Sequence, residues 1–213
     1  MTANDMGDEL ARIAEETQRC QACDLYIVAR QAVPGTGDPH AEAMLIGEAP
    51  SAFDDRSGRP FSGPTGVFLD ELLALAGMRR EQVFLTNVVK HRLLAGRELT
   101  PQEIAACAPF LTRQIAAVNP ILIVTLGRYA LAHFLPKARI SAIHGQARQQ
   151  GGRVLLAMYN PAAALHREEL RETVVRDFTH ALPAALAEAR RLAAEGKLEP
   201  GKDEPGPQQL SLF

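Results

Sequence analysis

The apolar positions of this chain alternate between short continuous runs and longer stretches in which they recur every three or four residues. The continuous runs have the length and composition of buried strands and lie at 43–47, 82–87, 120–127 and 153–159. The stretches with helical spacing lie at 9–20, 66–77, 100–118, 128–135 and 168–195. This alternation predicts an α/β fold: a three-layer α/β/α sandwich with a central parallel sheet of about four strands.

Local signals add helix ends and a domain boundary. Thr100 is typical of an N-cap, with Pro101 at the first helical position and Glu103 completing a capping box. Pro183 is expected to kink the last helical stretch. From Gly196 onward Gly, Pro, Lys and Glu dominate, which predicts a single domain over 1–195 and a flexible tail over 196–213.

Composition narrows the class of protein. The chain has 213 residues, three cysteines and no apolar run long enough to span a bilayer, so we expect a monomeric cytoplasmic protein without a disulfide framework. The net charge is −2, yet 56–153 holds 13 Lys and Arg against 5 Asp and Glu. This excess is compatible with polyanion binding and equally with an uneven solvated surface.

Ligands of parallel α/β sheets bind beyond the carboxyl ends of the strands. Four segments are expected there: "GEAPSAFDDRSGRPFSGPTG" (47–66), "NVVKHR" (87–92), "GRYA" (127–130) and "NPAAALHR" (160–167). With "CQAC" (20–23) and the distant Cys107, they resemble the family 4, iron–sulfur uracil-DNA glycosylases over most of the chain. In that family the pattern is C-x-x-C, "GEAPG", an acidic pair, "GRPF.G..G", "NVVKCR", a distant Cys and "HPS" or "HPA". Two departures stand out, since His91 replaces a cysteine and Asn160 replaces the motif histidine.

The resemblance implies a [4Fe–4S] cluster held by Cys20, Cys23, His91 and Cys107. Imidazole is an accepted iron ligand in Rieske centres, so His91 does not abolish such a site. A zinc ion remains an alternative because Cys₃His is a standard zinc set, as does no metal at all, with His91 following Lys90 onto the DNA face. A subgroup that traps uracil covalently shares "VKH", but its histidine-bearing insertion has no counterpart here, so covalent trapping is not expected.

The resemblance also implies a base pocket. Phe61 would stack on a flipped uracil and Asn87 would pair with the base edge, one donor and one acceptor meeting O4 and N3–H. Glu48 and Ala49 would line the pocket and offer backbone N–H groups. Ser51 occupies the place where a bulky residue excludes the thymine methyl group in other uracil glycosylases.

Catalysis requires an acid near the sugar and a donor near the uracil O2. Position 49 holds alanine where many uracil glycosylases have a water-activating aspartate, so Asp54 is the first choice for general base or electrostatic stabiliser and Glu48 the second. Asn160 would donate to the developing oxyanion in place of a histidine. A weaker donor predicts a slow enzyme.

Contacts with DNA are expected from the segment after the fourth strand and from basic residues around the loops. Leu165 would enter the minor groove as an apolar wedge. Residues expected to touch phosphates are His166, Arg167, Arg59 and Lys90. Two functions stay open: a DNA-repair glycosylase that leaves an abasic site, and a uracil- or abasic-site DNA-binding protein with little turnover.

The chain closes with "QQLSLF", an apolar motif on a polar tail. It resembles the peptide by which bacterial repair proteins hold the DNA sliding clamp, with Gln209, Leu210, Leu212 and Phe213 as the contacts. Such a tether would place the protein at the bacterial nucleoid during repair and raise its effective concentration there.

Overall fold

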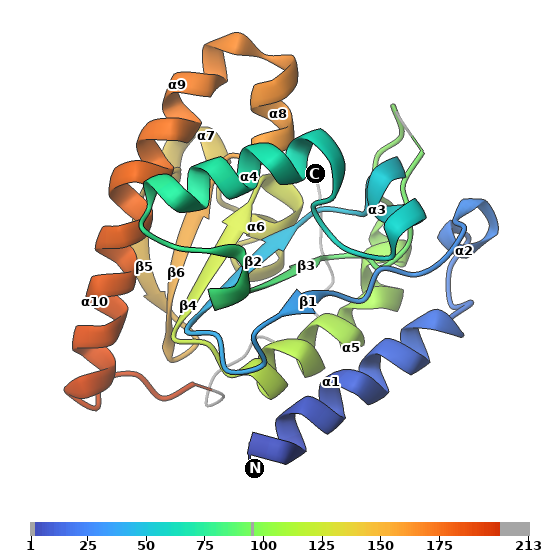
Figure 1. Cartoon of the computed structure of the whole chain (residues 1–213), viewed down its shortest axis with the longest axis horizontal. Coiled ribbons are helices and arrows are strands. Elements are labelled where there is room, and N and C mark those ends of the chain that lie inside the picture. The colour runs from blue at the N-terminus through green and yellow to red at the C-terminus, as the bar shows by residue number, and fades with distance from the viewer. Residues whose placement is uncertain (1–2, 95, 201–213) are drawn as a thin grey trace.

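A six-stranded, mostly parallel sheet forms the centre of the protein in a computed structural model that describes residues 3–94 and 96–200 (Figure 1). The strand order is β1-β3-β2-β4-β6-β5. The four central strands are parallel and comprise β2 (Ala43–Gly47), β3 (Val83–Asn87), β4 (Leu122–Leu126) and β6 (Arg153–Met158). The predicted parallel sheet is therefore confirmed.

Two antiparallel edge strands extend this sheet beyond the predicted four. They are β1 (Thr36–Gly37), paired with β3, and β5 (Ala147–Gln150), paired with β6. The first has only two residues and the second is mostly exposed, so neither carries the apolar run by which a buried strand is recognised.

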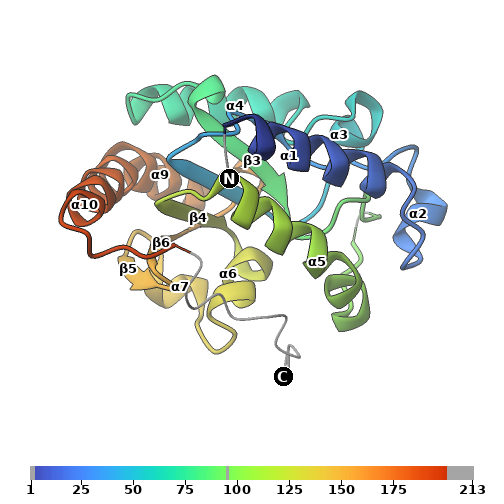
Figure 2. The ribbon, with the colours of Figure 1, turned by 90° about the horizontal axis from the view of Figure 1, so that it is seen from below.

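Helices cover both faces of the sheet, and side-chain alternation along the strands separates two cores. On β2, Leu45 faces a core shared with α4 (Gly63–Leu75) and α10 (Leu182–Ala194), whereas Met44 faces one shared with α5 (Pro101–Val118) and α6 (Arg128–Phe134). Figures 1 and 2 show α1 (Ala3–Gln18) lying alongside α5. The three-layer arrangement is thus confirmed.

The expected helix boundaries follow from identifiable contacts. Thr100 Oγ1 accepts from the Glu103 amide at 3.2 Å, and the Glu103 carboxylate accepts from the Thr100 amide at 2.8 Å, so α5 begins with the predicted capping box. Near Pro183 the helical stretch divides into α9 (Glu168–Arg176), a π turn at Asp177–Ala181, and α10. The backbone nitrogen of proline carries no hydrogen, so Pro183 cannot donate the regular helical hydrogen bond, which accounts for the break in the helix there.

Short helices fill the connections at the carboxyl ends of the strands. They are α2 (Leu25–Val28), α3 (Ala52–Ser57) and α8 (Pro161–His166), with α7 (Ile140–Ile143) leading to β5. Figure 1 shows α3 beyond the tip of β2 and α8 at the top of the molecule beside α9. Asp54 lies on α3, and Leu165 and His166 lie on α8, whereas the other side chains expected to touch a ligand lie outside these short helices.

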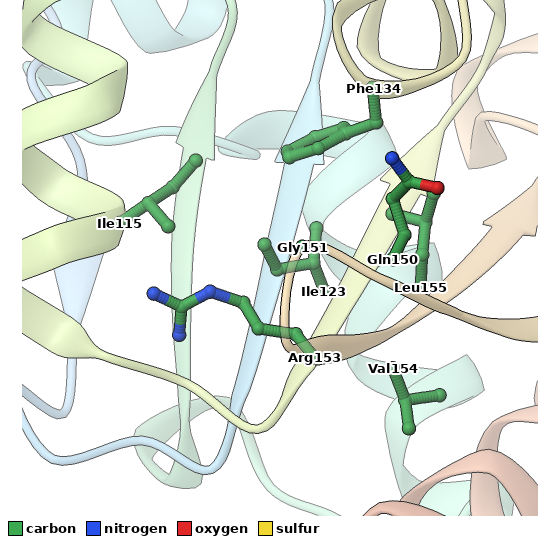
Figure 3. Close-up of a pocket in the computed structure, with 8 residues that line it drawn as sticks. All are labelled: Ile115, Ile123, Phe134, Gln150, Gly151, Arg153, Val154 and Leu155. Carbon is green, nitrogen blue, oxygen red and sulfur yellow. The ribbon is translucent and has the colours of Figure 1, made fainter. Parts of the chain in front are cut away.

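A small cavity of about 20 Å³ lies at the opposite end of the sheet (Figure 3). It is lined by side chains near the first residues of β4 and β6, among them Ile123, Arg153 and Val154, together with Phe134. A space of this size holds about one water molecule. It is too small to take a nucleobase.

The chain stays against the domain a few residues past the last helix. Leu198 packs on the core, and the Lys197 amide donates to Leu192 O at 2.9 Å. The clamp-like residues Gln209, Leu210, Leu212 and Phe213 lie outside the described residues. Among the helices described, none has both the length and the apolar content to cross a membrane.

Candidate active site

The floor of the candidate pocket is the backbone of Gly47 at the end of β2. A Cβ atom on this residue would lie 2.4 Å from Asn87 Oδ1 and 2.7 Å from Phe61 Cζ. Both distances are far below an ordinary contact, so only glycine leaves room for the amide and the ring. The structure therefore brings together three residues from separate segments of the chain, as the sequence analysis expected of Phe61 and Asn87.

Asn87 carries a buried side-chain amide whose oxygen faces this floor. It stands opposite Gly47 in the parallel register of β2 and β3, and its side chain is buried. Its amide nitrogen, Nδ2, has no hydrogen-bond partner among the described residues. A buried donor left in this state costs about 1–3 kcal/mol. Binding of a ligand is one way in which such a group is satisfied.

Phe61 adopts a backbone conformation that is unusual for a residue with a side chain. Its φ is +51°, and its carbonyl accepts from Arg80 Nη2 at 3.0 Å. Arg80 also donates to the carbonyl of Gly66 and pairs with Asp70 at 2.6 Å. The strained loop is thus held by an arginine that sequence reasoning missed, because nothing near position 80 marks it as part of the site.

Asp54 points inward and ties the loop together. Its Oδ2 accepts from the Ser51 amide at 2.9 Å and its Oδ1 from the Ser62 amide at 2.6 Å. The hydroxyl of Ser51 in turn accepts from the Asp54 amide, which completes the N-cap of α3. Both carboxylate oxygens of Asp54 are therefore engaged by backbone donors.

Glu48 is the carboxylate that stands directly at the end of β2. Its side chain is half-buried, and burial raises its pKa above the ordinary value while Arg128 opposes that shift. The half-buried Ala49 follows it. A carboxylate so placed keeps its proton to a higher pH than an exposed one.

Asn160 is the N-cap of α8 and lies beside the loop that follows β4. Its Oδ1 accepts from the Ala162 amide at 3.0 Å, which orients Nδ2 as the remaining donor of the side chain. A Cβ atom on Gly127, whose φ is +93°, would lie 3.4 Å from the Asn160 Cβ. The loops after β4 and β6 therefore adjoin at this point.

The residues after Asn160 expected to meet DNA are on the surface. Leu165 is 39% exposed, and His166 and Arg167 are exposed beside it. Arg59, in the first loop, is exposed as well. These positions are open to a partner at the side of the molecule where the strands end.

The prediction that Lys90 contacts DNA is wrong. Its side chain is fully buried, and Nζ donates to Thr86 Oγ1 at 2.8 Å, Asn87 O at 2.6 Å and Gln114 Oε1 at 2.7 Å. Burial lowers the pKa of Lys90 to about 7. The chain after β3 turns this side chain inward, so Lys90 supports the end of the strand and does not reach phosphate.

The three cysteines lie within electrostatic range of one another. Burial raises the pKa of the Cys107 thiol to about 11, with further contributions from Cys23 and Cys20 and an opposing one from Lys90. Burial also raises the pKa of Cys23. The cysteines that precede α2 and the one on α5 therefore face a common region, although they are far apart in the sequence.

His91 adjoins the same region through the backbone. The amide of Lys90, the preceding residue, donates to Cys107 Sγ at 3.3 Å, and His91 itself is buried. Burial lowers the pKa of His91, while Asp55 opposes that shift. The neutral imidazole favoured by this environment is the form that binds metals. The donor set thus suits a soft metal centre, although the described part of the chain contains no group of three or more His, Cys, Asp or Glu side chains placed to hold a metal ion.

Asp55, behind His91, has a structural role in the loop. Its Oδ1 accepts from the Arg30 amide at 2.8 Å, and its Oδ2 lies 3.8 Å from an Arg92 nitrogen. The carboxylate therefore links the segment after α2 to α3. This contact joins the segment that follows the first two cysteines to the loop that carries Phe61.

Taken together, the site defines a class of protein: an α/β protein in which an aromatic ring and a buried amide lie side by side at the end of a central strand, next to a half-buried carboxylate. The model of the uracil DNA glycosylase superfamily matches residues 34–182. The chain belongs to the uracil DNA glycosylase superfamily.

Individual relatives agree with this assignment. A type-4 uracil-DNA glycosylase of Archaeoglobus fulgidus is 39% identical over 180 residues, which cover 80% of this chain and 90% of the relative. The type-4 enzyme of Sulfurisphaera tokodaii is 37% identical over 193 residues, 86% of this chain and 88% of the relative. A type-5 uracil-DNA glycosylase of Thermus thermophilus is 38% identical over 149 residues, 60% of this chain and 68% of the relative.

Proposed function

We propose that this protein is a DNA-repair enzyme that hydrolyses the N-glycosidic bond of uracil in DNA and leaves an abasic site. The observation that carries the proposal is the buried amide nitrogen of Asn87, a donor without a partner in the described structure, beside the ring of Phe61. The similarity to curated type-4 uracil-DNA glycosylases over most of both chains supports it.

Recognition follows from the geometry of the pocket. A flipped uracil would lie against the Phe61 ring, accept at O4 from Asn87 Nδ2 and donate N3–H to Asn87 Oδ1. Cytosine presents a donor at the position of O4, so it would leave Nδ2 unsatisfied. The pocket would thus select uracil through Asn87 Nδ2, the buried donor that is costly to leave without a hydrogen-bond partner.

We propose the reverse order for the two candidate acids because of their surroundings. Both oxygens of Asp54 accept from backbone amides, which assigns it to holding the loop between Ser51 and Ser62. Glu48 is half-buried at the strand end, and we assign to it the activation of water and the stabilisation of positive charge on the sugar. Asp54 then acts as a positioning residue for the loop that carries Phe61.

Asn160 would stabilise the departing base. Its Oδ1 caps α8, so Nδ2 is the atom able to donate toward uracil O2 as negative charge develops there. A neutral amide fixed by a cap stabilises an oxyanion without proton transfer. Ser51, whose hydroxyl caps α3, and Ala49 would complete the wall of the pocket.

We assign Cys20, Cys23, His91 and Cys107 as ligands of a [4Fe–4S] cluster. When bound, the cluster would fasten the segment before α2 to α5. Metal binding must displace the thiol protons that burial favours, so binding would release protons and couple to folding. Metal analysis of the purified protein tests this assignment. Iron together with sulfide would support the cluster, whereas zinc as the only metal would indicate a zinc site instead.

A second function is favoured by one observation. Ala49 stands where an acid would help, and Asn160 is a neutral donor, so a protein that holds uracil or abasic DNA with little turnover is the alternative. A labelled uracil oligonucleotide treated with the protein and then with alkali separates the two. Strand breaks indicate a glycosylase, whereas a gel shift without breaks indicates a binding protein.

The terminal motif would serve this activity by location. We propose that Gln209, Leu210, Leu212 and Phe213 bind the bacterial sliding clamp and deliver a monomeric cytoplasmic enzyme to newly replicated DNA. A tether raises the local concentration of a weak DNA binder without new DNA contacts.

A further inference from the structure

Phe53 is an exposed aromatic residue on the loop that builds the base pocket. It lies on α3, directly before the inward-pointing Asp54, and its side chain is 46% exposed. A Cβ atom on Gly63 would come within 2.4 Å of the Phe53 ring, so the ring rests on the backbone two residues after Phe61. One loop therefore carries a buried ring against the pocket floor and a second ring on the surface.

A cation lies over the exposed ring. The guanidinium carbon of Arg56, itself an exposed residue, is 4.6 Å from the Phe53 ring centroid. The same arrangement occurs at Phe68, where Arg171 lies 4.6 Å from the centroid, but that ring is buried in the core. The pair on α3 differs because its aromatic surface is open to a partner.

We propose that Phe53 and Arg56 form a stacking platform for a base next to the flipped nucleotide. The inference rests on the proposed function, because a nucleotide held between Phe61 and Asn87 places its neighbours at the surface of this loop. An aromatic ring beside an arginine is the combination by which proteins bind single-stranded nucleic acid, the ring stacking on a base and the cation meeting phosphate.

Exchange of partners on the ring is energetically reasonable. A cation–π contact at an exposed site is weaker than the stacking of a base on an aromatic side chain. An arriving base can therefore displace the guanidinium, which remains close enough to meet the phosphate of the same nucleotide. The gain in binding free energy from stacking on Phe53 is greatest for single-stranded DNA, because a neighbouring base in a duplex is already stacked and paired.

The substrate class follows: the platform favours uracil in single-stranded DNA or at frayed and unpaired positions.

Phe53→Leu keeps apolar volume but removes the π face, and Phe53→Tyr keeps both. The probe is a short single strand with a tetrahydrofuran abasic-site analogue, which is not cleaved, and its duplex form. Binding is measured by fluorescence anisotropy.

We expect Phe53→Leu to weaken single-strand binding about tenfold, with a smaller loss on duplex, and Phe53→Tyr to bind within about twofold of the original protein. The control is Leu75→Ala, an exposed apolar residue (53%) at the far end of α4, which should change neither. Equal single-strand binding by the Leu and original proteins, or equal losses by Leu and Tyr, would overturn the platform.

Arg56→Met gives an independent readout. It should lower the slope of binding against salt concentration on single strands by about 0.7, the value for one phosphate contact. An unchanged slope would overturn the role of Arg56. Failure of the proposed function is distinguishable, because it would show as intact uracil oligonucleotide with the original protein, whereas the binding measurements do not require cleavage.

Discussion

Lys90 Nζ donates a 2.6 Å hydrogen bond to the backbone oxygen of Asn87, the residue whose side-chain nitrogen has no hydrogen-bond partner in the described structure. Thr86 and Gln114 accept the other two bonds of the ammonium group, so its three donors are matched by three acceptors. The same lysine joins the pocket to the cysteine region, because its amide donates to Cys107 Sγ. Lys90 therefore stabilises the interior of the protein and is not part of its surface.

Lys90→Met should destabilise the protein and reduce excision together. Methionine fills the space but leaves buried acceptors unsatisfied, at a cost of about 2 kcal/mol, which corresponds to a loss of about 4–8 °C in Tm. We expect the excision rate to fall about tenfold as Asn87 loses its support. Lys137→Met, at an exposed lysine, is the control for loss of charge. Unchanged Tm and activity in Lys90→Met would contradict the supporting role.

Glu48→Gln should lower kcat by about a hundredfold and remove the acid limb of the pH profile. The ionised carboxylate is the active form, and burial raises the pKa of Glu48 above 4.5, so kcat of the original protein should fall as the pH decreases through that raised value. The measurement is single-turnover excision across pH. Asp54→Asn, which weakens a loop contact, should lower Tm while the acid limb stays in place. If Asp54→Asn removed that limb and Glu48→Gln kept it, the two roles would have to be exchanged.

His91→Cys should retain iron, and His91→Ala should lose it on mild heating or chelation. Cysteine supplies a thiolate in place of the buried imidazole, whereas alanine leaves three ligands. Iron content and the visible absorbance report the outcome without reference to activity. His91→Ala with the iron content and Tm of the original protein would remove His91 from the ligand set.

Deletion of Gln209–Phe213 should abolish binding to the sliding clamp and leave excision on a short oligonucleotide unchanged. We expect the apolar anchors to contact the clamp, since the hydrophobic cores of the described structure are built from residues before position 199. Surface plasmon resonance with immobilised clamp measures the first property. Clamp binding by the shortened chain, or loss of its fold, would contradict the tether.

Much of the fold is accessible from the sequence because its central strands are short apolar runs. The runs that form β2, β3, β4 and β6 are buried on both faces and flanked by loops, which is the pattern that identifies parallel strands. β1 and β5 escape this reasoning because they lie at the edges and bury little. Their pairing is determined by neighbours distant in sequence.

Some features of the candidate site could likewise be predicted from the sequence, and others could not. The convergence of Gly47, Phe61 and Asn87 could be expected from the positions of their segments after parallel strands. The inward direction of Lys90 could not, because loop periodicity does not distinguish the two sides of the chain. The contact of Arg80 with Phe61 O is likewise a tertiary feature, made by an arginine in a different loop.

Excision of uracil by Asn87→Asp, compared with the original protein, is the decisive measurement of how the base is recognised. Aspartate has the size of asparagine but replaces the Nδ2 donor by an acceptor, which would face uracil O4. We predict that the original protein releases uracil from a labelled oligonucleotide and that the variant loses at least about a hundredfold in kcat/KM with its Tm retained. Undiminished excision by a folded Asn87→Asp protein would contradict the central claim that this buried amide reads the base.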